Sequence, residues 1–562
     1  MRRINYAQRG IIAFLLVIAF LCTTSCSSEK SLPLKSADSG VSAIIKKRIT
    51  EWKPSLETVL GGERIYAPVL VKNFYEARNY QPAWSQNGHL IQAETLIRAV
   101  EEAYSDGLMP DYYHLNLIRS LVANVEKKSF PDQVRLSDLD VLLTDAFVTL
   151  GCHLSGGCVD PVTIKAEWFA KRGNVDVTSL LEQALKKRQI RETLMRLRPE
   201  QASYERLREA LALYRRLLLN GKWPQVSKGP FLKKDSVSDR VVKLRKRLAA
   251  SGDMDVNEAK GSSLFDDKLK QSVIRFQKRH GLMADGIVGS ATLNALNIPL
   301  KDRIRQIELN MERLRWILGN DEQRSIVINV ANFELYVVEN GKSVLSMKVV
   351  VGKPYWHTPV FTAKMTYLVI NPSWNVPDSI AREEMLKAVK KAPHYLAKQN
   401  IKVIKGWGSR EEEIDYQTID WSKITAETLV YRFRQEPGPL NPLGYLKFML
   451  PNKFNVYLHD TPAKNLFSEN IRTFSHGCTR IEKPLELAEY VLRDDPRWTQ
   501  EKLLAAIKNG TEQEVRIPHP LNVHFLYLTA WVDEQGTLQF RDDIYGRDEL
   551  LDKALHEKPS LQ

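Results

Sequence analysis

One short segment of the chain, "HDTPAKNLFSENIRTFSHGCTR" at residues 459–480, concentrates side chains that could carry out nucleophilic chemistry. Cys478 follows Gly477, and His459 lies 19 residues earlier. A cysteine attacks a carbonyl carbon as a thiolate, so it needs a base, a group that orients the base, and N–H donors for the oxyanion that forms. We therefore predict that Cys478 is a nucleophile, that His459 is its base, and that Gly477 lets backbone N–H groups approach the oxyanion closely.

Two other interpretations of this segment are less favoured. A lone cysteine is commonly a small core residue, but residues 475–480 around Cys478 are not core-like, being mostly polar or charged. A zinc site formed by His459, His476 and Cys478 would need a His-x-Cys ligand spacing. That spacing is unusual, and no further Cys or His pair supports it.

The elements that must position these residues are predicted to be β-strands. "FNVYLHD" ends a strand near His459, and the loop that follows can fold back over the strand end. Apolar and polar residues alternate through "SIVINVANFELYVVENGKSVLSMKVVVGK", where Asn340-Gly341 is a strong hairpin-turn signal. We predict a β-rich domain over residues 324–556, interrupted over 378–445 by a helical and then irregular insertion of the kind that forms lids.

The chain ahead of this domain is predicted to be helical. From residue 60 to 225, apolar residues recur at spacings of three and four, and this part is interpreted as a scaffold. Residues 238–297 predict three short amphipathic helices, with Gly286 and Gly289 shaping the turn before the third. A linker helix over 298–323 follows. The expected fold class is multidomain α+β, and the expected core of the small module consists of Val241, Leu244, Leu248, Leu269, Val273, Phe276, Leu293 and Leu296.

Residues 1–26 have the features of an export signal. Basic residues precede the apolar run "IIAFLLVIAFLC", and no later stretch approaches the roughly 20 apolar residues of a transmembrane helix. "TTSCSS" around Cys26 resembles a bacterial lipoprotein cleavage site, although Thr23 stands where that pattern prefers Leu or Val. We expect an exported protein, either lipid-anchored at Cys26 or released by ordinary signal-peptide cleavage, with residues 27–59 as a tether.

Charge and cysteine usage limit the partners. The formal net charge of +14 suits an acidic polymer. The basic residues are spread throughout without a compact basic block, so an acidic envelope surface or wall is expected as partner and nucleic acid is not. Cys152 and Cys158 could close a small loop or be two small buried residues on a helix, and either way Cys478 has no obvious disulfide partner.

Two parts of the sequence resemble known families. "FQKRHGLMADGIVGSATLNALN" is similar to the peptidoglycan-binding three-helix module of many wall enzymes. The 459–480 segment resembles the signature of bacterial L,D-transpeptidases, in which a histidine precedes a Ser-His-Gly-Cys-x-Arg or -Asn run by a loop of this length. "FELYVVENGKSVLSMKVVVGKPYWHTPVF" and "INPSWNVP" extend the likeness. With the helical block, the resemblance covers roughly residues 60–556 and points to the large multidomain subgroup of Gram-negative bacteria.

The resemblance implies a role for each residue of the motif. Cys478 would be the nucleophile and His459 its base, oriented by a backbone carbonyl near Asp460 or Gly477. The N–H groups of Gly477 and Cys478 would form the oxyanion hole, with Tyr457 as an additional donor. The remaining residues would contact substrate: Arg480, which suits a carboxylate, and the pocket-lining His476, Ser475 and Trp374.

The reaction implied by the resemblance is acyl transfer in two steps. Cys478 attacks the carbonyl of diaminopimelate, the third residue of a tetrapeptide stem, and expels the terminal D-alanine. The side-chain amine of a second diaminopimelate then resolves the thioester and forms a 3-3 cross-link. No cofactor is needed, the lid would exclude water, and carbapenems are expected to acylate Cys478.

The expected setting is the periplasm. The implied partners are tetrapeptide stems, a glycan-polymerising synthase and a D,D-carboxypeptidase that supplies tetrapeptides, with the membrane contacted only through a lipid anchor. The alternatives are an L,D-carboxypeptidase, an enzyme that attaches stems to a lipoprotein or exchanges terminal amino acids, and a non-catalytic wall-binding lipoprotein. A papain-like peptidase is disfavoured because that family places Cys before His.

Overall fold

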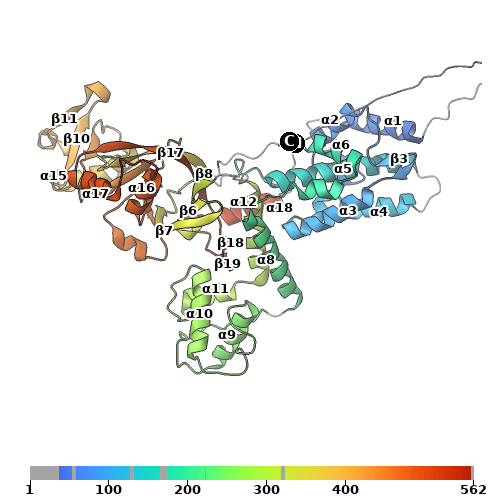
Figure 1. The fold of residues 1–562 in the computed structure, drawn as a ribbon, viewed down its shortest axis with the longest axis horizontal. Coiled ribbons are helices and arrows are strands. Elements are labelled where there is room, and N and C mark those ends of the chain that lie inside the picture. Colours follow the sequence, from blue (N-terminus) through green and yellow to red (C-terminus); the bar gives the residue numbers. More distant parts are fainter. Residues whose placement is uncertain are drawn as a thin grey trace, which may run out of the picture.

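The computed structural model describes residues 37–52, 58–126, 132–164, 169, 175–221, 223–317 and 323–557. The predicted export signal at residues 1–26, with Cys26, lies outside these ranges. The described chain forms a helical block, a three-helix module and a β-rich body, and the first and last of these lie at opposite ends of the molecule (Figure 1). This mixed architecture confirms the predicted fold class. No helix within the described ranges is both long and apolar enough to cross a membrane.

Helix α5 (Gln133–Gly156) is the centre of the helical block. Asp132 caps its start by accepting a hydrogen bond from the Val134 N–H, and most residues along its length are buried. A helix that is buried on all sides must be surrounded by other elements. The helices of this block that contact it include α1 (Ala37–Thr50), α2 (Pro68–Ala77), α3 (Ala93–Glu102), α4 (Leu115–Glu126), α6 (Val177–Lys187) and α7 (Ile190–Met195). The block also contains α8 (Ala202–Leu219) and the strand pairs β1 (Val59–Leu60) with β2 (Glu63–Arg64) and β3 (Ser85–Gln86) with β4 (His89–Leu90).

Helix α1 lies within residues 27–59, which were predicted to be a tether, and its position shows that part of this prediction was wrong. Val41, Ile45 and Ile49 repeat at a spacing of four, are fully buried, and belong to the core of the helical block. One apolar residue per turn is a weak signal among Ser and Lys residues, which is why the composition suggested a tether. Residues 37–50 are therefore part of the folded block.

The small module consists of α9 (Asp239–Ala250), α10 (Asp267–Arg279) and α11 (Ser290–Asn297). Ser238 and Asp266 cap α9 and α10 through their side chains. Every residue predicted for its core is buried. Gly286 adopts a left-handed φ of +74°, whereas Gly289 has an ordinary φ of −87° and precedes α11 directly. Only the first of these two turn glycines is thus required by its backbone conformation.

Helix α12 (Leu300–Arg315) is much more than the predicted linker. It packs along α8 and against the hairpin of β18 (Ala530–Val532) and β19 (Leu538–Phe540), and it carries buried residues on most of its sides. In Figure 1 it lies between the helical block and the β-rich body. The three parts of the chain therefore meet at one buried helix.

The β-rich body is built on a nine-stranded sheet with the order β15-β7-β16-β14-β13-β8-β17-β5-β6. Because β6 also pairs with β7, the sheet closes on itself. The predicted hairpin turn joins these two strands, with φ of +47° at Asn340 and +75° at Gly341. The strands are β5 (Arg324–Asn329), β6 (Glu334–Glu339), β7 (Lys342–Gly352), β8 (Phe361–Ile370), β13 (Leu446–Met449), β14 (Leu458–His459), β15 (Thr473–Ser475), β16 (Thr479–Ile481) and β17 (Gln513–Leu526). The helices of this part are α16 (Pro484–Leu492), α17 (Gln500–Asn509) and α18 (Arg547–His556).

The insertion predicted at residues 378–445 folds around a core of its own. It begins with α13 (Asp378–Ile380), a π-helical turn at Ala381–Met385, α14 (Leu386–Lys391) and α15 (Tyr395–Lys398). The remainder was expected to be irregular but contains β10 (Ile401–Lys405), β11 (Glu412–Ile414) and β12 (Arg432–Gln435). These strands form a four-stranded sheet with β9 (Trp374–Asn375), in the order β11-β10-β12-β9. The strands are too short for their alternation to be conspicuous in the sequence.

Candidate active site

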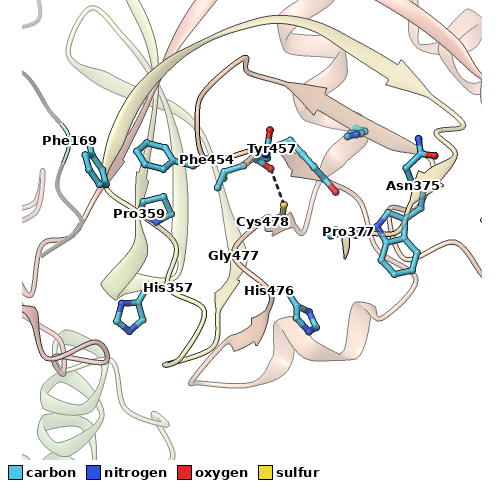
Figure 2. Close-up of a pocket in the computed structure, with 14 residues that line it drawn as sticks. Phe169, His357, Pro359, Asn375, Pro377, Phe454, Tyr457, His476, Gly477 and Cys478 are labelled. Atoms are coloured by element: carbon cyan, nitrogen blue, oxygen red, sulfur yellow. Dashed lines mark hydrogen bonds between the residues drawn. The ribbon is translucent and has the colours of Figure 1, made fainter. Parts of the chain in front are cut away.

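A pocket of about 620 Å³ opens beside Cys478 (Figure 2). Its walls come from the loops and strand ends of the β-rich body, from the start of the insertion, and from one residue of the helical block. The lining residues are Phe169, His357, Pro359, Trp374, Asn375, Pro377, Lys447, Phe454, Asn455, Val456, Tyr457, His476, Gly477 and Cys478. Among the predicted site residues, Cys478, Gly477, His476, Tyr457 and Trp374 thus line one cavity.

The Cys478 thiol is protonated in this arrangement. Its Sγ donates to the Asn455 carbonyl at 3.7 Å, the contact drawn as a dashed line in Figure 2. Burial raises the pKa of Cys478, and the effect is opposed by the N–H and hydroxyl of Tyr457 and by the positive charges of Lys447 and Arg480. These groups would stabilise a thiolate once it forms.

His459 lies on β14, and strand pairing places it among the other site residues. It is opposite Arg480 on the parallel strand β16 and opposite Lys447 on the antiparallel strand β13. Its ring centroid lies 5.7 Å from that of Tyr457, whose carbonyl accepts a hydrogen bond from the Thr479 N–H beside Cys478. The pairing of β14 with β16 therefore brings the two halves of the motif side by side.

Backbone carbonyls orient the His459 imidazole. Nδ1 lies 2.6 Å from the Asp460 carbonyl, which can only accept, so Nδ1 carries a proton there, and the Pro442 carbonyl is a second backbone acceptor for the ring. Burial and the nearby positive charge of Arg480 lower the pKa of His459 to about 3. The ring is therefore neutral at pH 7, as a base must be. Among the described residues, however, no hydrogen bond joins His459 to the Cys478 sulfur.

Gly477 and Ser475 form a tight loop, and their placement corrects two predictions. Gly477 has a left-handed φ of +112°, and its N–H donates to Ser475 Oγ at 3.1 Å. Ser475 is buried, does not line the pocket, and donates its hydroxyl proton to the Cys478 carbonyl at 2.5 Å. Because the Gly477 N–H is already used, the remaining donors predicted for the oxyanion hole are the Cys478 N–H and the Tyr457 hydroxyl, which hydrogen-bonds to Cys478 in this arrangement. Burial raises the pKa of Tyr457 well above its ordinary value, so that hydroxyl remains a donor.

Arg480 and Lys447 place positive charge beside the sulfur. Burial lowers the pKa of both side chains, and no carboxylate among the described residues forms an ion pair with either. Arg480 Nε is buried without a hydrogen-bond partner in the described chain, although the residue does not line the pocket itself. Unpaired cations in a half-buried site suit an anionic ligand.

The insertion reaches the motif through His476. The His476 ring centroid lies 3.8 Å from that of Trp356, with the two rings tilted by 37°, and His476 Nε2 lies 2.7 Å from Glu384 Oε1 in the π-helical turn. Trp374, on β9 at the base of the insertion, lines the same pocket. The insertion thus borders the pocket that contains Cys478, as a lid would.

Sequence reasoning missed several residues that line the pocket. Lys447 could have been suspected as a lone charge in the apolar strand "YLKFML", but its position opposite His459 depends on strand register. Phe169 lies in the helical block and gave no signal at all. Phe454, Asn455 and His357 belong to loops whose course cannot be read from residue types.

Three parts of the chain match known protein families. Residues 69–211 match a family described as "Scaffold domain", residues 237–296 one described as "Putative peptidoglycan binding domain", and residues 323–507 one described as "L,D-transpeptidase catalytic domain". The third match contains every predicted site residue. It ends before β17, which is the longest strand of the described sheet.

The chain is also similar to individual proteins. A protein of Haemophilus influenzae named "Putative L,D-transpeptidase" is 33% identical over 252 residues, which are 44% of this chain and 49% of the relative. The match therefore spans about half of that protein. A crystal structure of an L,D-transpeptidase from Stackebrandtia nassauensis shares 14% identity and a TM-score of 0.20, covering 54% of this chain and 96% of that one. A second, from Xylanimonas cellulosilytica, shares 14% identity and a TM-score of 0.16, covering 53% and 99%.

Proposed function

Because residues 323–507 form an L,D-transpeptidase catalytic domain in a chain that also carries a peptidoglycan-binding domain, we propose that this protein forms 3-3 cross-links between peptidoglycan stem peptides. The donor would be a tetrapeptide stem and the acceptor the side-chain amine of diaminopimelate in a second stem. The observation that carries this proposal is the Cys478 thiol, which borders a 620 Å³ pocket beside a neutral imidazole and two cations that form no ion pair with a described carboxylate.

In the first step, Cys478 Sγ attacks the carbonyl carbon of the third stem residue. The thiol proton leaves the Asn455 carbonyl and passes to Nε2 of His459, whose ring is oriented by the Asp460 carbonyl. The oxyanion accepts hydrogen bonds from the Cys478 N–H and the Tyr457 hydroxyl. When the C–N bond breaks, His459 returns the proton to the amine of the departing D-alanine, and a thioester remains.

In the second step, the acceptor amine attacks the thioester carbon. The C–S bond breaks, the amine nitrogen loses a proton to His459, and the sulfur takes up a proton to regenerate the thiol. Water that reached the thioester instead would release a tripeptide, so the outcome depends on excluding water. The insertion that contacts His476 through Glu384 is in a position to do this.

The cations of the site match the charge of the substrate. A tetrapeptide stem ends in a carboxylate, and diaminopimelate carries another. Lys447 lines the pocket and Arg480 lies next to His459 in the paired strands. We assign the stem carboxylates to these two side chains, since each pairing would give a carboxylate partner to a cation that forms no ion pair within the described chain.

The proposed setting is the periplasm, reached through the export signal at residues 1–26. A membrane anchor would be lipid on Cys26. Fractionation of cells that produce the wild-type chain and the Cys26→Ala variant tests this assignment. Wild-type protein in the membrane fraction and variant protein in the soluble periplasmic fraction would support the lipid anchor, whereas equal distribution of the two proteins would contradict it.

The cross-linking proposal is tested by incubating the protein with disaccharide-tetrapeptide and separating the products by mass. The wild-type protein should give a dimer that has lost one D-alanine, and Cys478→Ala should give none. Tripeptide alone would identify an L,D-carboxypeptidase. The absence of any product from the wild-type protein would favour the wall-binding alternative.

A further inference from the structure

One wall of the pocket comes from the helical block, 290 residues before the start of the catalytic motif in the sequence. Phe169 lines the pocket, and its N–H donates to the Val360 carbonyl of the β-rich body at 2.8 Å. Its ring centroid lies 4.6 Å from that of Phe454, which in turn lies 5.1 Å from the ring of the core residue Phe361. Phe169 is thus anchored on the catalytic domain, yet it remains 36% exposed, so a ligand can contact it.

The pocket has two sides with Cys478 between them. In Figure 2, Phe169, Phe454 and Pro359 lie on one side of the sulfur, and Asn375 and Pro377 lie on the other. The second side belongs to the base of the insertion. A two-step transfer needs both sides, because the donor remains attached to the sulfur while the acceptor approaches. The thioester must be kept from water, so the donor fits the side bordered by the insertion and the acceptor fits the side of Phe169.

The chemistry of the Phe169 side suits an amine that must react. An amine is a nucleophile only when neutral, and both burial against apolar groups and nearby cations favour its neutral form. Lys453 Nζ lies 4.4 Å from the centroid of the Phe169 ring, and Lys447 lines the same pocket. The aromatic rings of Phe169 and Phe454 offer an apolar surface for the aliphatic chain that carries such an amine.

We propose that Phe169 is a positioning residue for the acceptor substrate. With Phe454 it forms the surface on which the aliphatic, amine-bearing side chain of the acceptor stem rests before it attacks the thioester. The helical block is then part of the substrate-binding surface as well as a scaffold. This inference rests on the proposed transpeptidase function and adds to it the residue that separates aminolysis from hydrolysis.

The test uses the full chain with disaccharide-tetrapeptide as both donor and acceptor. Two quantities are measured: the rate at which the acyl adduct forms, and the ratio of cross-linked dimer to hydrolysed tripeptide. Phe169→Ala should leave the acylation rate within about twofold of the wild type and lower the dimer-to-tripeptide ratio about tenfold. The ratio does not depend on the fraction of folded enzyme, so a loss of protein cannot imitate the effect.

Two further variants serve as controls. Phe169→Tyr keeps the ring and should keep the wild-type ratio. Val162→Ala alters an exposed apolar residue in the same stretch of the helical block, outside the pocket, and should also keep it.

The outcomes separate this inference from the function on which it rests. An unchanged ratio in Phe169→Ala would overturn the acceptor assignment while leaving the transpeptidase function intact. A slower acylation with an unchanged ratio would place Phe169 on the donor side and would also overturn it. A wild-type protein that forms neither adduct nor product would overturn both proposals.

Discussion

At the scale of single residues, the site is a neutral thiol–imidazole pair. Burial raises the pKa of Cys478 and lowers that of His459 to about 3, so at pH 7 neither group is charged. An ion pair of thiolate and imidazolium would require both shifts to have the opposite sign. Nucleophilicity is therefore expected to arise when substrate arrives and the proton moves to His459, because a neutral pair avoids burying two charges in the empty site.

The raised pKa of Cys478 predicts how its alkylation rate depends on pH in the absence of substrate. A raised pKa means a smaller thiolate fraction at each pH, so the iodoacetamide rate should keep rising through pH 9, beyond the range of an ordinary cysteine. Tryptic cleavage after Arg472 and Arg480 yields the peptide Thr473–Arg480 with Cys478 as its single cysteine, and its modification can be followed by mass spectrometry. A plateau already reached near pH 7 would show an ion pair and contradict the assignment.

Lys447 provides a second prediction at this scale. Its positive charge lowers the pKa of Cys478, so Lys447→Met should shift the alkylation profile of Thr473–Arg480 to higher pH. The same change should raise the KM for tetrapeptide about tenfold, the loss of one charge-assisted hydrogen bond. Lys364→Met is the matched control, because Lys364 is an exposed lysine of β8 that does not line the pocket. Equal profiles for the two variants would exclude the proposed effect of Lys447.

At the scale of elements, the parallel pairing of β14 with β16 assembles the motif. His459 and Cys478 could be recognised from sequence because their residue types are unusual and the strand before His459 is short and local. The prediction that Ser475 lines the pocket was wrong for a physical reason. Side chains alternate along a strand, and the neighbouring Phe474 is the exposed residue while Ser475 points inward. A polar residue three positions before Cys478 need not face the pocket.

Helix α1 gives a prediction for an element whose sequence looked like a tether. Ile45 is fully buried within the core of the helical block. Ile45→Ala should therefore lower the free energy of unfolding of that block by about 2–4 kcal/mol, measured by urea denaturation. Lys47→Ala, at an exposed position of the same helix, should change it by less than about 0.5 kcal/mol. If Ile45→Ala behaved like the control, α1 would be the flexible tether that composition suggested.

At the scale of the whole molecule, α12 links the helical block to the β-rich body through buried charges. Arg315 pairs with Glu312 at 2.7 Å and also donates to the Asp106 carbonyl, while Glu312 accepts from the Val159 N–H of the helical block. Arg313 of α12 also pairs with Asp548 of α18, which belongs to the β-rich body. The sequence pattern predicted helix α12 but not its position, because amphipathic spacing does not reveal which elements pack against each face of a helix.

Removing one partner of the buried Arg315–Glu312 pair should destabilise the contact between the helical block and the β-rich body. Arg315→Met leaves Glu312 buried without its cation, which should destabilise the assembled molecule by about 3–5 kcal/mol. Arg305→Met, which removes a partly exposed cation from the same helix, should cost less than about 1 kcal/mol. Denaturation followed by tryptophan fluorescence distinguishes the two variants, and similar midpoints for both would contradict the role assigned to the Arg315–Glu312 pair.

Phe169 shows the limit of sequence reasoning at this scale. The residue belongs to the part matched as a scaffold and lines the pocket of another domain. Its contact depends on the route of the chain between two domains, to which no local pattern contributes. The catalytic motif, by contrast, is contained within 22 residues and could be found directly.

The proposed mechanism requires Cys478 to carry the acyl group, and locating that group by mass spectrometry tests the mechanism. The wild-type protein and Cys478→Ala would be mixed with disaccharide-tetrapeptide, quenched in acid, digested with trypsin and mapped by mass spectrometry. We predict that the wild-type peptide Thr473–Arg480 gains the mass of the stem minus D-alanine, and that the variant peptide gains nothing. Acylation of another residue, or an equal adduct on the variant, would contradict the proposed role of Cys478.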